Sequence, residues 1–273
     1  MKALATMKKL ALIAVSALAL AGFAAGAAAQ EAGPRLMPAP DNRLDVASLQ
    51  RGARDFVNYC LTCHSAKYMR YNRLADLGLT PEEITGNLMF ATSKIGDTMT
   101  VAMRDDDAKT LFGNPPPDLS VEARVRGRDW LYSYLLGFYR DDKTASGWNN
   151  LVFPNVAMPN VLWQLSGTGK RVEKEFDDEH SAEAAAIAVK GLAMVEPTKD
   201  HKYMMVTVAP DVPGTMTRAQ YEAFVGDLVN YLDYMSEPVR NERIHLGIIV
   251  LIFLGVLFAL AYALKRDYWK ALH

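Results

Sequence analysis

Cysteine is scarce in this protein, since only two occur in 273 residues. A closed structural zinc site needs four ligands, and no second cysteine pair is present to supply them. A disulfide between two such close cysteines would close too small a loop to stabilise a fold appreciably. The sequence also lacks an internal repeat and a set of alternating strands, and this favours a mainly α architecture.

The two cysteines stand in the run Cys60-Leu61-Thr62-Cys63-His64, the spacing at which a c-type haem is attached. Two thiols one helical turn apart can each form a thioether with a vinyl group of one haem, and the adjacent imidazole can bind its iron. A thioredoxin-like dithiol has the same spacing, but it opens a helix, whereas this pair closes an amphipathic one. We therefore predict one covalently attached haem c held by Cys60, Cys63 and His64.

Charge is absent from the stretch Leu10 to Ala29, which follows three lysines and is rich in alanine. It ends in three consecutive alanines, a pattern typical of a signal peptidase site, so residues 1–29 are predicted to be a secretory signal peptide. A permanent N-terminal membrane helix is the weaker alternative because of that cleavage-like end. Export also fits a c-type haem, which bacteria attach outside the cytoplasm.

A second charge-free stretch of nineteen residues runs from Leu246 to Leu264. At about 1.5 Å per residue it is long enough to cross a bilayer. We assign residues 244–264 to a single transmembrane helix in the bacterial inner membrane. Because basic residues flank it on both sides, the signal peptide decides the orientation: residues 30–243 form a periplasmic haem domain and 265–273 a cytoplasmic tail.

The exported part is acidic. Without the predicted signal peptide and tail, 24 Lys and Arg face 30 Asp and Glu, a formal charge of −6. Such a surface favours a basic partner, or it serves solubility alone. The acidic run 173–179 lies in a charged insertion, residues 166–203. It is either a docking site or a solvent-exposed segment without a binding role.

Hydrophobic periodicity predicts two amphipathic helices on either side of the haem segment. One follows Asp45 or Ser48 as its N-cap, and the other follows a capping box at Thr217 and ends before Pro238. A shorter helix should start at Pro81, and residues 130–139 should form a buried helix. Residues 91–118 and 144–169 are expected to be loops. The predicted fold is mainly α, a cytochrome-c-like haem domain with long loops plus one C-terminal transmembrane helix.

With His64 on one side of the iron, the group that fills the sixth position decides whether the haem transfers electrons or binds ligands. Met158 is the best candidate because it lies far downstream of His64 in a loop held by Pro154 and Pro159, which fix the backbone. On spacing alone, other residues remain candidates for the sixth ligand: Met99, Met103 and Met194, or His180 or His201 in a bis-His pair with His64.

Several features occur together in a fixed order. They are a signal peptide, the CxxCH run, Pro116-Pro117-Asp118-Leu119-Ser120, Met158-Pro159, Glu237-Pro238 and the anchor end Tyr262-Ala263-Leu264-Lys265-Arg266. This set resembles the cytochrome c1 family, the haem c subunits of the ubiquinol:cytochrome c oxidoreductase or bc1 complex. The likeness runs from the region of Asp45 to the C-terminus.

The resemblance implies thioether links at Cys60 and Cys63, with His64 and Met158 as axial ligands. It also implies that Arg126 pairs with a haem propionate, with Arg124 as the alternative. The partners would be cytochrome b beside the anchor, a Rieske iron–sulfur protein as electron donor, and a soluble or membrane-bound cytochrome c as acceptor. No substrate bond would be made or broken in this subunit, so it would not be an enzyme in isolation.

The sequence departs from the family pattern in two respects. The segment 166–203 is longer than a minimal family member needs, and no third cysteine exists for the additional disulfide of some bacterial relatives. Other functions also fit a single haem: an electron-donor subunit of a terminal oxidase or nitric oxide reductase, an open-iron enzyme or gas sensor, and an assembly scaffold. The C-terminal anchor disfavours the first of these.

Overall fold

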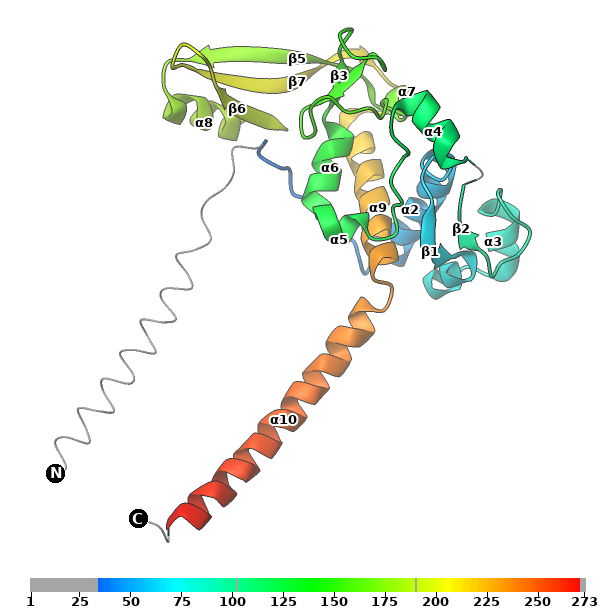
Figure 1. The fold of residues 1–273 in the computed structure, drawn as a ribbon, viewed down its shortest axis with the longest axis vertical. Coiled ribbons are helices and arrows are strands. Elements are labelled where there is room, and N and C mark those ends of the chain that lie inside the picture. Colours follow the sequence, from blue (N-terminus) through cyan, green and yellow to red (C-terminus); the bar gives the residue numbers. More distant parts are fainter. Residues whose placement is uncertain (1–33, 102, 190, 271–273) are drawn as a thin grey trace, which may run out of the picture.

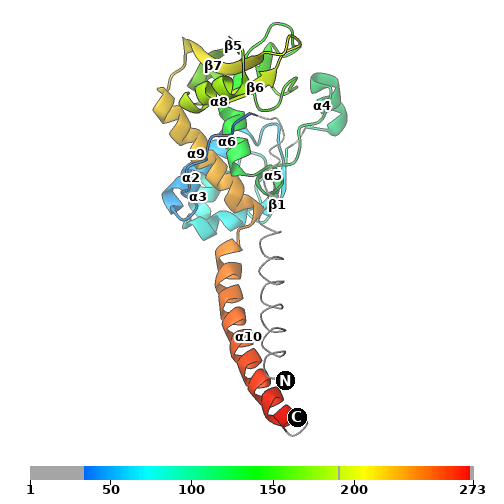
Figure 2. The same ribbon diagram turned by 90° about the vertical axis from the view of Figure 1, so that its left-hand side faces the viewer.

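The computed structural model describes residues 34–101, 103–189 and 191–270. The predicted signal peptide lies outside these residues, as do the last three residues of the predicted tail. Figures 1 and 2 show a helical domain with a small sheet at one end and a long helix, α10, leaving at the other.

The helical elements carry most of the domain. They are α2 (Val46–Tyr59), the 3₁₀ helix η1 (Tyr71–Leu77), α3 (Pro81–Asn87), α4 (Asp105–Phe112), α5 (Glu122–Arg126), α6 (Arg128–Leu136), α7 (Trp163–Ser166), α8 (Glu179–Ala188), α9 (Arg218–Ser236) and α10 (Arg240–Trp269). The strands are β1 (Ala66–Arg70), β2 (Thr98–Met99), β3 (Phe138–Arg140), β4 (Trp148–Asn150), β5 (Gly167–Phe176), β6 (Ala193–Pro197) and β7 (Tyr203–Pro213).

The starts of three helices agree with the sequence. Asp45 caps α2 by accepting from the Ala47 amide at 3.0 Å, and Thr80 and Thr217 begin α3 and α9 with complete capping boxes. These caps satisfy amide groups that have no partner within the helix. They act within one turn of chain, and for this reason the local sequence predicts them.

The core is built on the crossing of α2 and α9. Phe56 and Tyr231 meet there with ring centroids 5.7 Å apart, and both are fully buried. Beside them the buried carboxylate of Asp227 accepts from the Ser48 hydroxyl at 2.5 Å and from Arg51 Nε at 2.6 Å. A buried charge needs such partners to offset its desolvation, so this contact fixes how the two helices pair.

The expectation of a mainly α fold is only partly met. Much of the predicted insertion belongs to a three-stranded antiparallel sheet of order β5-β7-β6. Helix α8 covers one face of that sheet, where Ala186, Ala193 and Met205 are buried together. The opposite face contributes Met194 and Val206 to a cluster with Leu151 and Val152 of the main domain. The insertion is therefore packed on the domain.

The acidic run at the start of this unit is partly neutralised within the chain. Glu173 accepts from Arg171 at 2.7 Å, and Lys202 pairs with Glu175 at 2.5 Å and with Asp177 at 3.7 Å. These are exposed pairs of small energetic value. They reduce the net negative charge that a basic partner would meet there.

Several segments that the sequence assigned to loops contain regular structure. Residues 91–118 include β2 and the two-turn helix α4, and residues 144–169 include β4 and α7. The predicted helix over 130–139 ends earlier, because the chain turns at Gly137 and Phe138 enters β3, which pairs with β4. Short strands depend on a distant partner, so periodicity alone does not reveal them.

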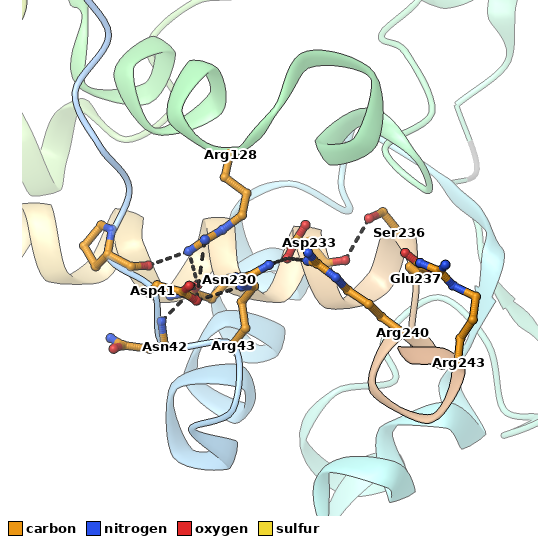
Figure 3. A network of polar contacts seen from close by, with 11 residues as sticks. Asp41, Asn42, Arg43, Arg128, Asn230, Asp233, Ser236, Glu237, Arg240 and Arg243 are labelled. Atoms are coloured by element: carbon orange, nitrogen blue, oxygen red, sulfur yellow. Dashed lines mark hydrogen bonds and ion pairs between the residues drawn. The ribbon is translucent and has the colours of Figure 1, made fainter. Parts of the chain in front are cut away.

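The segment before α2 is tied to the domain and to the anchor by a polar network (Figure 3). Asp41 pairs with Arg43 at 2.7 Å, and Asp233 at the end of α9 lies 3.6 Å from Arg43 and 3.3 Å from Arg240. One carboxylate thus connects the N-terminal lead-in, α9 and the first turn of α10. The network holds the start of the long helix close to the haem domain.

Helix α10 is the one helix in the described part of the chain that is long and apolar enough to cross a membrane. It extends beyond the predicted 244–264 at both ends, and its apolar side chains are exposed on every side. Both views show it standing apart from the domain (Figures 1 and 2). A helix that is apolar all round needs an apolar surrounding, which a bilayer supplies.

Candidate haem site

The attachment motif lies at the end of α2. Cys60 is the C-cap of this helix, and the amides of Cys63 and His64 donate to its carbonyl oxygen at 3.1 and 2.8 Å. This tight turn brings both thiols and the imidazole together. The thiols are free, and burial raises the pKa of Cys60 to about 12, so it is protonated at neutral pH.

The imidazole of His64 is oriented by the proline-rich segment. Its Nδ1 lies 2.8 Å from the carbonyl oxygen of Pro117. Because a carbonyl can only accept, Nδ1 carries the proton and the lone pair of Nε2 is left to bind a metal. Burial lowers the pKa of His64, which also favours the neutral ring.

The same segment is fastened to the strand that follows the motif. Asp118 accepts from the Lys67 amide at 2.9 Å, and Ser120 Oγ accepts from the Tyr68 amide at 3.0 Å. The Leu119 amide donates to Ser65 at 2.8 Å. The Pro-Pro-Asp-Leu-Ser run therefore holds the carbonyl of Pro117 against His64, and this accounts for its polar residues.

Met158 is half-buried in the loop before α7, beside the buried Phe138, Trp148 and Val156. Its sulfur accepts a hydrogen bond from the hydroxyl of Tyr134 at 3.4 Å. A half-buried thioether that keeps one side open can still bind a soft metal.

Arg126 and Met158 both lie against the pair of stacked rings formed by Trp130 and Tyr134. The guanidinium of Arg126 is 4.8 Å from the centroid of Trp130, and Trp130 stacks on Tyr134 with centroids 5.0 Å apart. Arg124 is two residues earlier on α5, so its side chain leaves the helix on a different side from that of Arg126. The structure therefore separates the two arginines that the sequence left as alternatives.

The other ligand candidates lie in different surroundings. Met99 is fully buried, and its sulfur accepts from Tyr231 in the helical core at 3.7 Å. Met194 packs in the sheet, and His180 and His201 are exposed on the same sheet unit. Met103 and Cys63 both line a cavity of about 250 Å³ next to the motif.

The residues present fit a c-type haem. Two free thiols lie beside an imidazole whose Nδ1 is already bonded. The thioether of Met158 and the cation of Arg126 come from two other segments, and both lie against the stacked rings of Tyr134 and Trp130 on α6. When bound, the haem supplies one-electron redox chemistry. The protein's part is to orient His64 through Pro117 and to hold Met158 beside Tyr134.

Sequence reasoning missed two groups at this site, the carbonyl of Pro117 and the hydroxyl of Tyr134. The first belongs to the backbone, and no residue type signals which carbonyl will meet a ring. The second had a signal, since Trp130 and Tyr134 are four residues apart and share one face of α6. Its partner, Met158, is distant in sequence, and only the fold joins the two.

Comparison with known proteins agrees with these observations. The model of the Cytochrome C1 family matches residues 38–272. The chain belongs to the cytochrome c1 family. It is 45% identical over 230 residues to cytochrome c1 of Allochromatium vinosum, which covers 84% of this chain and 86% of the relative. It is 25% identical over 260 residues to the mitochondrial cytochrome c1 haem protein of Saccharomyces cerevisiae, covering 85% and 70%.

A further relative carries a different description. The chain is 44% identical over 257 residues to a Nitrosomonas europaea protein described as an ammonia monooxygenase gamma subunit, covering 94% of this chain and 96% of the relative. Family membership confirms two sequence predictions: one covalently attached haem c, and the function of an electron-carrying haem c subunit of the bc1 complex. It also supports attachment to a membrane.

Proposed function

We propose that this protein passes single electrons from a Rieske iron–sulfur protein to a soluble or membrane-bound cytochrome c, and that it makes and breaks no substrate bond by itself. The observation that carries this proposal is the match of a cytochrome c1 family model over residues 38–272, with a free CxxCH motif inside it. A haem that only exchanges electrons needs both axial positions filled, and the chain offers an imidazole and a thioether for them.

The family resemblance supplies the proposed roles, and the local contacts of these side chains support them. Cys60 and Cys63 carry the thioether links, and His64 and Met158 are the axial ligands. Arg126 is the partner of a haem propionate. In support, its guanidinium lies over Trp130, which stacks on Tyr134. Imidazole and thioether ligation raises the potential of a haem, which suits an acceptor that receives electrons from a Rieske centre.

The proposed arrangement in the membrane has four parts. They are a signal peptide over 1–29, a periplasmic haem domain over 30–243, a transmembrane helix over 244–264 beside cytochrome b, and a cytoplasmic tail over 265–273. The apolar and exposed surface of α10 supports the third part. The ion pairs of Asp233 support a haem domain held close to the membrane surface.

Purification from native membranes tests the assembly. An affinity tag at the C-terminus of the full chain should recover a cytochrome b and a Rieske protein, together with quinol-dependent cytochrome c reduction. Recovery of a terminal oxidase or nitric oxide reductase in their place would contradict the proposal.

A second candidate function comes from the Nitrosomonas europaea relative, which is described as an ammonia monooxygenase gamma subunit. The same purification separates the two candidates. Monooxygenase subunits in the recovered complex, without cytochrome b, would favour this second function. The family match favours the first, because the cytochrome c1 family carries electrons, and the CxxCH motif supplies the haem that this needs.

Replacing Arg126 by glutamine should lower the midpoint potential of the haem by about 50 mV. One unit charge within about 15 Å contributes about 1 kcal/mol at an effective dielectric constant of about 20, and its loss disfavours the reduced state. Redox titration of the purified protein measures the shift. The matched control is Arg124→Gln, which removes the same charge two residues earlier on α5, from a different side of the helix. An equal or larger fall in the control would assign the propionate to Arg124.

A further inference from the structure

The hydroxyl of Tyr134 donates a hydrogen bond to the sulfur of Met158, across 3.4 Å. Tyr134 lies on α6, and Met158 lies in the loop that follows β4, so the contact joins two separate elements. Sulfur is a weak acceptor, and Tyr134 is only half-buried, so its hydroxyl does not need the sulfur as a partner to escape burial without a hydrogen bond. A hydrogen bond to a proposed axial ligand is therefore a contact with a functional consequence.

Two neighbouring rings hold Tyr134 in this position. Trp130 stacks on it with an interplanar angle of 8°, and Phe138 meets it edge-on with centroids 5.1 Å apart. A ring held on its face and its edge cannot swing away without losing both contacts. Its hydroxyl thus stays directed at the sulfur.

The sheet of the insertion lies behind these rings. Tyr134 and Trp130 both pack against a buried cluster that consists of Leu151, Val152, Leu192, Met194 and Val206. Met194 belongs to β6 and Val206 to β7, so the tyrosine packs against side chains from one face of the sheet. This gives the insertion a structural task near the haem, which its charged sequence did not reveal.

We propose that Tyr134 raises the potential of the haem through its hydrogen bond to Met158, without being needed to keep Met158 on the iron. The inference rests on the proposed function, in which Met158 is an axial ligand. A donor on the thioether draws electron density from the sulfur. The oxidised state depends more on that density than the reduced state does, so the bond favours the reduced state.

Removing the hydroxyl by Tyr134→Phe should change the reduced-to-oxidised ratio at a fixed potential by about threefold. This corresponds to a fall in midpoint potential of about 28 mV for one electron, at 59 mV for each tenfold change. The measurement is a redox titration of the haem-loaded full chain, with the sulfur-to-iron charge-transfer band recorded in the same sample. The matched control is Tyr132→Phe on the same helix, which removes a buried hydroxyl at a position that packs in the main core.

The expected result is a lower potential in Tyr134→Phe, an unchanged potential in Tyr132→Phe, and a charge-transfer band in both. A potential equal to that of the parent protein in Tyr134→Phe would overturn the inference. Loss of the band in this variant would also overturn it, because the hydroxyl would then hold the ligand in place and not tune it.

A second variant should shift the midpoint potential in the opposite direction. A ring-fluorinated tyrosine at position 134 is a stronger donor of nearly the same size, so it should raise the potential above that of the parent protein. A fall would contradict the inference even if Tyr134→Phe folds poorly. Failure of the ligand assignment is recognised separately, since Met158→Leu would then keep the charge-transfer band.

Discussion

Replacing Met158 with leucine should lower the midpoint potential of the haem by about 0.2 V, a substantial part of the range of about 0.8 V over which axial ligands set haem potentials. Leucine has nearly the same volume as methionine, so the half-buried loop should keep its packing while the iron loses its proposed thioether ligand. Redox titration of the purified protein measures the change. Electron transfer to the acceptor cytochrome should remain possible, but the Rieske donor would reduce this haem far less completely.

The same variant should bind carbon monoxide in its reduced form at neutral pH, whereas the parent protein should not. An open iron position is needed for this reaction. Met103→Leu is the matched control, because Met103 lines the cavity beside Cys63 and was a candidate on spacing alone. If Met103→Leu lowers the potential and Met158→Leu leaves it unchanged, the axial ligand is Met103.

Replacing Gly52 with alanine should reduce the stability of the domain by about 3 kcal/mol or more, and should reduce the yield of haem-loaded protein. A methyl group at this position would overlap the backbone carbonyl oxygen of Asp227 and lie 2.6 Å from the Cβ of Tyr231. Both belong to α9, so the two helices would have to move apart. Their separation would also disturb the contact of Arg51 with Asp227.

Gly86→Ala provides the control for Gly52. Gly86 lies in α3, where an added methyl group would meet nothing within 4 Å. Alanine favours helix over glycine, so this variant should gain about 0.5–1 kcal/mol. Thermal unfolding, followed by the haem absorbance, compares the two. Equal stability of Gly52→Ala and the parent protein would show that α2 and α9 do not cross as closely as described.

The attachment motif could be predicted from the sequence because it is local. Cys60, Cys63 and His64 lie within five residues, and one turn of backbone brings them together whatever the rest of the chain does. The same reason applies to the caps at Asp45 and Thr217, whose partners are two or three residues away. The family likeness also rests on short runs in a fixed order.

The sheet could not be predicted in this way. Strand β5 is exposed along most of its length and carries charges at consecutive positions from Lys170 to Arg171 and from Glu173 to Glu175, so it shows no apolar alternation. It is a strand because β7 supplies its partners, with Val172 opposite Thr207 and Phe176 opposite Tyr203. Pairing across such a separation is decided by the fold.

The sequence by itself determined the covalent haem, the apolar anchor and the membership of a family, because each depends on residues that are neighbours in the chain. The tertiary structure decided that Pro117 orients His64, that Arg126 lies over Trp130, and that Tyr134 meets Met158. Each of these contacts joins segments whose distance is set only when α2, α6, α9 and the sheet pack around a common core, since side-chain contacts follow the packing of whole elements.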